Sequence, residues 1–413
     1  MSGSFPLLWR SISVETSWHK ERSLGIMNFR KCEGNRRLPC SLNHLIPLLL
    51  CAGLVASPGE AFAEIPRGVF SLSPAGGACK SAVLSNSNVV GVSIRQSWMD
   101  LEPSEGVFNW AFLDSEVARV ATAGKQISLR ISSQAGKPAW VTTAITSAGG
   151  SFYTFDDNGV PTTIPVFWDP TFLAKKTAMI AAMGAHFSKN PAIKIISVSF
   201  ANASSEDWNV PHTSSEVTQW LNLGYTSQKM LDAGKRVIDA TMTAFPNQYV
   251  TLAVAGNGHA GATGNLDPDA CYVARNAVQA ARTSWPGRLI VQINSLSTFN
   301  PVAPGPDDSV WHLLWDSRPD VAGQMLLWCY GDTTYRVNGG VISNPSLVLP
   351  KAIAAGASYG MKFVEIYQTD VVNLPPAIGY AQDALTGLGG PGPSPRPPAM
   401  AAPAAPTGLQ AQP

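Results

Sequence analysis

Short apolar runs that are typical of buried strands alternate with longer amphipathic runs through the middle of this 413-residue chain. The strand-like runs lie at 68–73, 89–96, 126–132, 193–200, 249–256, 289–294, 323–330 and 362–368. Helix-like segments lie between and after them, at 112–124, 170–187, 215–245, 269–285, 309–317, 344–358 and 377–388. This alternation predicts an α/β fold with a parallel sheet and helices outside it. Eight such units favour a (β/α)8 TIM barrel over residues 64–386. A doubly wound open sheet is the alternative, and the lack of a G-x-G-x-x-G run after the first strand disfavours it.

The first 63 residues have the three parts of a secretory signal peptide. Basic residues between 30 and 37 precede the apolar run at 45–56, and small residues follow up to Ala63. We expect cleavage after Ala63 and a secreted, periplasmic or cell-surface protein. The apolar run is too short to span a bilayer comfortably, so no stable membrane anchor is predicted.

The end of the chain, residues 387–413, is rich in proline, alanine and glycine and is typical of a semi-rigid linker or tail. Its last residues, PAAPTGLQAQP, resemble the opening strand of a fibronectin type III module. Further C-terminal modules are therefore an open expectation.

The composition limits the binding partners that we expect for this chain. The net charge is +1 and only 14% of the residues are charged, which does not favour a nucleic-acid partner. After signal cleavage the cysteines are Cys79, Cys271 and Cys329, and their spacing is not that of a metal site. We expect no metal and no cofactor.

The most specific stretch is VVGVSIRQSWMDLEPSEGVFNWAFLDSEVARVATAGKQISLRI, at 89–131. It resembles the second and third βα units of retaining glycoside hydrolases of the large barrel clan, especially the beta-galactosidase-like family 42 type. The matching residues are Trp98, Glu102, Pro103, Gly106, Phe108, Trp110 and Asp114. The resemblance covers residues 65–210 and implies a glycosidase with a carbohydrate substrate. We interpret the signature itself as largely structural, because proline fixes a turn and glycine allows a tight backbone.

Glycosidic hydrolysis needs two carboxyl groups, one as proton donor and one as nucleophile or base. The resemblance implies a donor Glu directly after an Asn at the end of the fourth strand. Here Asn202 is followed by Ala203, and the first acid is Glu206. Glu206 is the candidate donor, with Trp208 as an apolar wall that would raise its pKa. The alternative is that Ser204 or Ser205 caps a helix and Glu206 lies in its first turn.

The second carboxyl group is implied at the end of the seventh strand, where this sequence has no Glu. Glu365, inside the eighth strand-like run, is the candidate, because strand alternation puts it on one face with Phe363 and Tyr367. The alternative is a buried structural Glu paired with Arg95 or Arg130.

Candidate substrate-binding residues are polar or aromatic side chains near the predicted strand ends. They are Arg95, Trp98, Arg130, Trp140, Asn202, Trp208, Asn294, Trp328, Tyr330 and Tyr367. Two functions remain open: a secreted hydrolase of O-glycosidic bonds in an oligo- or polysaccharide, and a catalytically inactive barrel that binds carbohydrate or serves as a surface scaffold.

Overall fold

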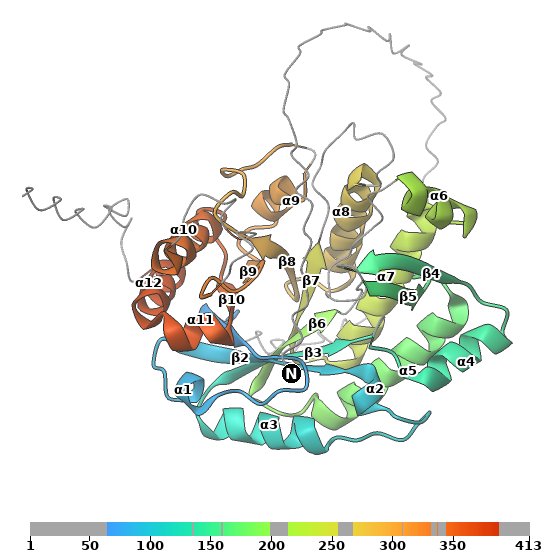
Figure 1. The fold of residues 1–413 in the computed structure, drawn as a ribbon, viewed down its shortest axis with the longest axis horizontal. Helices are drawn as coiled ribbons and strands as arrows, with labels where there is room; N and C mark the ends of the chain where they lie inside the picture. Colours follow the sequence, from blue (N-terminus) through green and yellow to red (C-terminus); the bar gives the residue numbers. More distant parts are fainter. Residues whose placement is uncertain are drawn as a thin grey trace, which may run out of the picture. The chain divides into compact units, whose positions relative to one another are not determined.

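The computed structural model describes residues 64–133, 136–157, 160–198, 214–254, 267–307, 309–331, 337 and 344–387. The predicted leader before Glu64 and the tail after Gly387 lie outside the described residues. Figure 1 shows the arrangement of the helices and strands within the barrel.

Eight parallel strands close into a barrel in the order β1-β10-β9-β8-β7-β6-β3-β2. Their bounds are β1 Gly68–Leu72, β2 Val89–Ser97, β3 Gln126–Ser132, β6 Ile193–Val198, β7 Tyr249–Val254, β8 Leu289–Leu296, β9 Val321–Met325 and β10 Phe363–Tyr367. The first and last strands pair in parallel from Gly68 with Phe363 to Leu72 with Tyr367, which closes the ring. The predicted (β/α)8 TIM barrel is therefore confirmed, and the open sheet is excluded.

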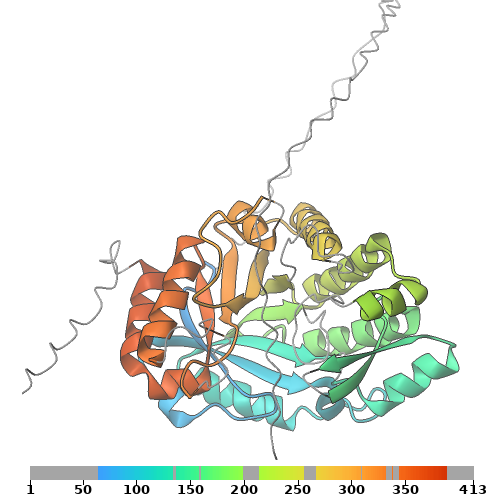
Figure 2. The same cartoon turned by 45° about the horizontal axis from the view of Figure 1, so that its top comes forward.

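Helices follow the strands and form the outer layer (Figure 2). Their bounds are α1 Ser81–Leu84, α2 Trp98–Leu101, α3 Ala111–Thr122, α4 Ala139–Ser147, α5 Pro170–Phe187, α6 Ser214–Asn222, α7 Ser227–Ala244, α8 Asp267–Ser284, α9 Val310–Asp316, α10 Pro345–Ser358, α11 Gln368–Asn373 and α12 Pro375–Thr386. Helix α5 packs on α7, and α7 on α8. Gly184 allows the first of these contacts, because a Cβ there would collide with the carbonyl of Ala244.

Two features differ from the sequence prediction. The helix expected over 215–245 is divided into α6 and α7, because Gly224 takes a left-handed backbone (φ +82°) between them. An antiparallel hairpin of β4 Phe152–Asp157 and β5 Val160–Pro165 was not predicted. Its signal was present, since the Asn158-Gly159 pair between two β-prone runs is typical of a hairpin turn.

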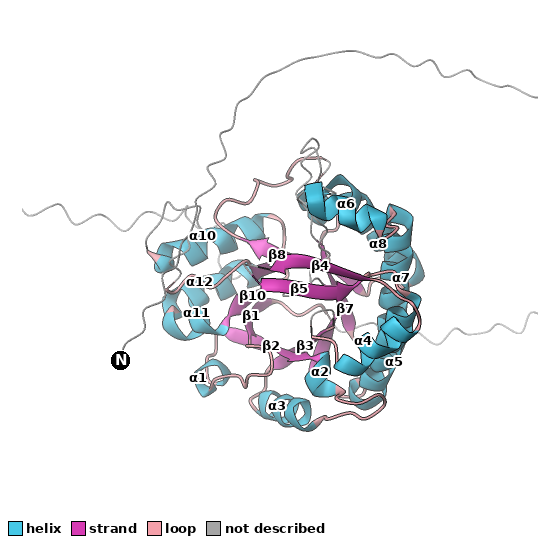
Figure 3. Cartoon of the chain, turned by 45° about the vertical axis from the view of Figure 1, so that its right-hand side comes forward, coloured by secondary structure: helices cyan, strands magenta, loops and turns pink. Residues whose placement is uncertain are grey.

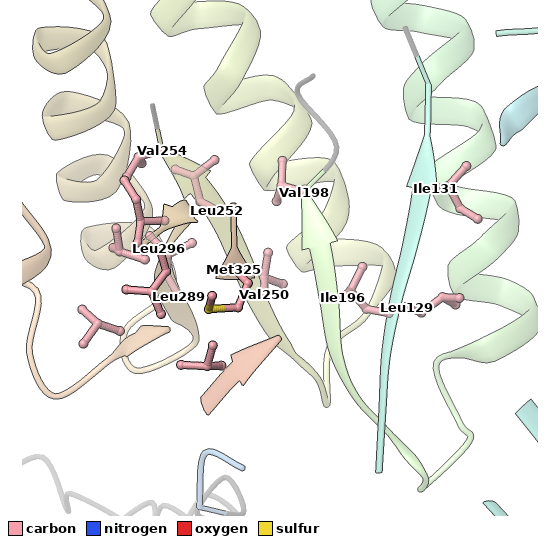
Figure 4. Packing of buried hydrophobic residues seen from close by; sticks show 14 of the residues in the cluster. Leu129, Ile131, Ile196, Val198, Val250, Leu252, Val254, Leu289, Leu296 and Met325 are labelled. Carbon is pink, nitrogen blue, oxygen red and sulfur yellow. The ribbon is translucent and has the colours of Figure 1, made fainter. Parts of the chain in front are cut away.

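The main hydrophobic core lies between the barrel wall and the helices. Figure 4 shows strand residues of this cluster, which include Leu129, Ile131, Ile196, Val198, Val250 and Leu252. Cys79, Cys271 and Cys329 are buried. Successive side chains of a strand point to opposite faces, so the residues between its core residues point into the barrel.

A second, smaller cluster is formed by inward-facing strand residues together with Ile65. Phe70 and Phe363 meet there with ring centroids 5.0 Å apart. Gly91 leaves room for the Phe70 ring, because a Cβ at this position would overlap it. Two residues further along β6, β7, β8, β9 and β10, the interior becomes polar, with Ser197, Thr251, Gln292, Gln324 and Glu365.

Candidate active site at the carboxyl ends of the barrel strands

The polar interior of the barrel is centred on Glu365 of β10. It is the only acidic residue within the eight strands as bounded above, and its side chain is fully buried. The contacts of its carboxylate come from β2, β3 and β8, which confirms that this face of β10 is the interior one.

Both oxygens of the Glu365 carboxylate accept hydrogen bonds. Ser93 Oγ donates to Oε1 at 2.6 Å, and Ser128 Oγ lies 3.5 Å from the same oxygen. Arg130 Nη2 and Gln292 Nε2 donate to Oε2 at 2.7 and 2.9 Å. A carboxylate offers about four acceptor positions, so this one is fully engaged by protein donors.

Arg130 is the ion-pair partner of Glu365, and both side chains have an exposed fraction of zero. Its Nη1 also donates to Gln324 Oε1 of β9 at 2.8 Å. Gln292 links the network to Asn294, whose Oδ1 accepts from Gln292 Nε2 at 2.8 Å. Arg130 and Asn294, both predicted as substrate-binding residues, are thus drawn into one buried network with Glu365.

Arg95, the other basic candidate partner of Glu365, lies elsewhere. Its Nε donates to the carbonyl of Ser73 at 2.7 Å, and the residue is half-buried. Its own carbonyl accepts from Gly76 N in the same loop. Arg95 therefore ties the loop after β1 to the end of β2, and the described contacts pair Glu365 with Arg130 instead.

Three aromatic candidates gather after β9 and at the end of β10. Trp328 and Tyr330 have exposed fractions of 43% and 46%. The Trp328 ring meets the Tyr367 ring edge-on, with centroids 5.7 Å apart, and Tyr367 Oη lies 3.4 Å from the carbonyl of Leu326. The predicted seventh strand, 323–330, ends early at Met325, so Trp328 and Tyr330 stand in the loop that follows β9.

Asp370, which sequence reasoning missed, holds this loop in place. Its buried carboxylate accepts from the backbone N–H of Cys329 at 2.9 and 2.8 Å and from that of Tyr330 at 2.7 Å. The residue lies in the first turn of α11, directly after β10. The available sequence signal was an acid just after the predicted strand at 362–368, but the loop amides that it binds are 41 and 40 positions away.

The prediction that Trp98 binds substrate is wrong. Its ring is fully buried, packs edge-on against Trp140 at 5.9 Å, and lies 6.3 Å from Phe172. Its Nε1 donates to Glu102 Oε2 at 2.7 Å, while Glu102 Oε1 accepts from Gly106 N at 2.8 Å. Trp140, half-buried, donates from Nε1 to the carbonyl of Glu102 at 2.9 Å. The signature is structural, as interpreted, and no face of the Trp98 ring is open to a sugar.

Trp110, also of that signature, occupies the N-cap position of α3 without a side-chain capping bond. Its ring is stacked between Phe108 at 4.9 Å and His186 at 4.3 Å, so it joins α3 to the end of α5. Glu206, the candidate proton donor, lies outside the described residues, as do Asn202 and Trp208. The last described residue before them is Val198, at the end of β6.

Part of the chain matches the model of one known protein family. Residues 79–234 match the family model of glycoside hydrolase family 42, described as beta-galactosidase. The match confirms the resemblance inferred from the signature around Glu102. No curated protein matches the chain.

Solved structures with a similar arrangement include a beta-amylase, a beta-galactosidase and a xylanase, each of low sequence identity. The catalytic domain of beta-amylase from Paenibacillus polymyxa is 11% identical, with 78% of this chain and 96% of that chain covered and a TM-score of 0.49. The beta-galactosidase from the psychrophilic Marinomonas ef1 is 12% identical, with 78% and 59% covered and a TM-score of 0.48. Xylanase B from Clostridium stercorarium F9 is 12% identical, with 73% and 86% covered and a TM-score of 0.43.

Proposed function

We propose that this chain, whose residues 79–234 match the beta-galactosidase family model, is an exported glycoside hydrolase that cleaves O-glycosidic bonds of an oligo- or polysaccharide. That match carries the proposal, because it spans β2, β3 and β6 and the segments that connect them. In a (β/α)8 barrel the reaction takes place at the carboxyl ends of the strands.

The exposed aromatic rings support a carbohydrate substrate. Trp328 and Tyr330 follow β9 at the carboxyl end of the barrel, and Asp370 fixes the backbone that carries them. Sugar rings present an apolar face, and aromatic side chains with a few polar groups nearby are typical of ligand sites. The family description makes β-galactosides the first substrates to test.

Two carboxyl groups are proposed for the reaction. Glu206, in the segment after β6, would donate a proton to the leaving oxygen, and Glu365 would attack the sugar or activate water. The Arg130 guanidinium lies 2.7 Å from Glu365, where it can orient the carboxylate for either role. A separation of about 5–5.5 Å between the two carboxyl groups would give retention, and one of about 6.5–9.5 Å inversion.

One observation favours the second candidate function, a barrel that binds carbohydrate without cleaving it. The Glu365 carboxylate has no accessible surface, and both of its oxygens are engaged by protein donors. Such a group must give up some of these contacts before it can reach a substrate. If Glu365 is purely structural, the eight barrel strands supply no second carboxylate for hydrolysis.

Substitution of the two acids separates the roles. Hydrolysis of a panel of methyl glycosides and oligosaccharides, whose leaving groups need a proton, is measured for the wild type, Glu206→Gln, Glu365→Gln and the control Gln279→Ala on the exposed surface of α8. The proposal expects Glu206→Gln to lower kcat on the order of 10²- to 10⁴-fold. Azide should restore turnover to Glu365→Ala if Glu365 is the nucleophile. Wild-type rates in Glu206→Gln and Glu365→Gln would refute the proposal that these two acids carry out the reaction.

Export is proposed from the leader pattern before Ala63. No described helix is long and apolar enough to cross a bilayer. Amino-terminal sequencing of the protein recovered from outside the cytoplasm should begin at Glu64. Recovery of the intact leader from the cytoplasm would contradict export without affecting the proposed reaction.

A further inference from the structure

A groove of about 340 Å³ lies between the β4–β5 hairpin and helix α6. The hairpin contributes Thr154, Phe155 and Pro161 to its walls, and the helix contributes Ser215, Glu216 and Gln219. None of these residues belongs to the network around Glu365 or to the aromatic group after β9.

The groove lies at the same end of the barrel as the candidate active site. The hairpin is inserted between β3 and α5, and α6 lies between β6 and α7. β3 and β6 are neighbouring parallel strands, and segments that follow strands emerge at their carboxyl ends. Figure 3 shows the hairpin in front of the barrel strands, with α6 beside it.

The two walls are held together by a buried aromatic cluster. The Trp220 ring of α6 meets Tyr153 of the hairpin edge-on at 4.7 Å and Trp168 at 5.3 Å. Burial, with a smaller contribution from the negative charge of Glu216, raises the pKa of the Tyr153 phenol. Glu216 and the hairpin residues line the same groove, and the contact of Trp220 with Tyr153 fixes its two walls against each other.

The lining combines one aromatic ring with short polar groups. Phe155 is half-buried, and its ring stacks on Tyr153 with centroids 5.5 Å apart. Gln219 offers both a donor and an acceptor, Glu216 adds carboxylate oxygens, and Ser215 and Thr154 add hydroxyl groups, of which that of Thr154 also bonds the Thr163 hydroxyl at 2.8 Å. An aromatic surface beside such groups suits a ring that has an apolar face and hydroxyl groups around its edge.

We propose that this groove binds a sugar unit of the substrate away from the bond that is cut, so that the substrate is an extended glycan. The link to cleavage rests on the proposed function, whereas binding at the groove does not. None of the six lining residues is cationic and one is acidic, which favours a neutral sugar over a phosphorylated or acidic ligand. The volume is near the lower end of ligand pockets, roughly 300–1,000 Å³.

Affinity electrophoresis tests the binding directly. The full protein is run in native gels that contain soluble galactan, xylan or starch, next to Phe155→Ala and Gln219→Ala. Gln279→Ala, an exposed Gln on α8, is the matched control. The proposal expects at least one polysaccharide to retard the wild type and the control. Phe155→Ala should weaken that retardation roughly three- to tenfold, and melting curves verify that the variants are folded.

Retardation of both groove variants equal to that of the wild type would overturn the proposal, as would a wild type that none of the three gels retards. Hydrolysis of p-nitrophenyl β-galactopyranoside by the same samples keeps the two proposals apart. If the groove holds a sugar unit away from the bond that is cut, turnover of this single-sugar substrate should be unchanged in Phe155→Ala and Gln219→Ala. If the wild type binds polysaccharide through the groove but cleaves none of the substrates, the proposed sugar binding at the groove stands and the proposed hydrolase function is refuted.

Discussion

The carboxylate of Glu365 lies 2.7 Å from the guanidinium of Arg130, and neither side chain reaches solvent. The pair joins β10 to β3 across the barrel interior, so it connects the last strand with the third. Removal of one partner from a buried ion pair leaves an uncompensated charge. We expect Glu365→Leu to lower the free energy of unfolding by about 3–5 kcal/mol.

The double variant Glu365→Leu with Arg130→Met should be less destabilised than Glu365→Leu alone, because no charge is then left unpaired. Urea denaturation of the four proteins in the cycle measures both effects. Additive losses would show that the two side chains do not depend on each other.

Asp370 is expected to support sugar binding through the backbone. Asp370→Ala leaves the buried N–H of Cys329 and the partly buried N–H of Tyr330 without their acceptor, which should cost about 2–4 kcal/mol of stability. The loop that carries Trp328 should then lose its fixed position, and KM should rise. The conservative Asp370→Asn keeps one acceptor oxygen and should fall between the two. A KM equal to that of the wild type in Asp370→Ala would show that the loop does not need this anchor.

Glu102 and Gly106 test the structural interpretation of the signature. Glu102→Ala removes the acceptor of Trp98 Nε1 and Gly106 N and should destabilise the fold by about 2–3 kcal/mol. Gly106→Ala should cost only about 1–2 kcal/mol, because the backbone is left-handed (φ +74°) but nothing would crowd the new Cβ. Thermal melts give the losses, and kcat at a temperature where both variants are folded should stay at the wild-type value. A selective loss of kcat in Glu102→Ala would assign Glu102 to the chemistry instead.

Lys176 of α5 should make stability depend on pH. It is fully buried, and desolvation lowers its pKa from 10.5 to about 7. Between these values the unfolded chain binds the proton more strongly than the folded one, so the contribution of Lys176 to stability increases as the pH rises from about 7 to about 10.5. Urea denaturation at pH 7, 8.5 and 10 should show this slope in the wild type and a flatter one in Lys176→Met. Lys175→Met, at the neighbouring and partly exposed position, is the control. Equal slopes in all three proteins would exclude Lys176 as the source.

The regular alternation of apolar strand-like runs with helix-like segments was sufficient to predict the fold. Each of the eight barrel strands overlaps a predicted apolar run, and α5 has the predicted bounds, Pro170–Phe187. Buried parallel strands are apolar for most of their length, so they stand out in a sequence. The short helices α1, α2, α4 and α11 were not predicted, because local periodicity is weak over so few residues.

The site was predicted only in part. A charged residue within an apolar strand identified Glu365 as paired or functional, and alternation placed it inside the barrel with Tyr367. Which arginine pairs with it, and how Asp370 binds the loop after β9, depend on neighbours brought together by the closed barrel. Trp98 was misassigned for a related reason: its position directly after β2 suggested the mouth, but the side chain turns into the core toward Trp140.

The central claim is that this barrel cleaves glycosidic bonds, and proton NMR of the wild-type protein with β-galactosides, galactan, xylan and starch tests it most directly. The account predicts new reducing-end signals with at least one substrate, and the anomer that appears first distinguishes retention from inversion. Retention would favour a separation between the Glu206 and Glu365 carboxyl groups of about 5–5.5 Å, and inversion a wider one. No new reducing end with any of these substrates, from folded protein that still binds one of them, would contradict the hydrolase and favour the carbohydrate-binding barrel.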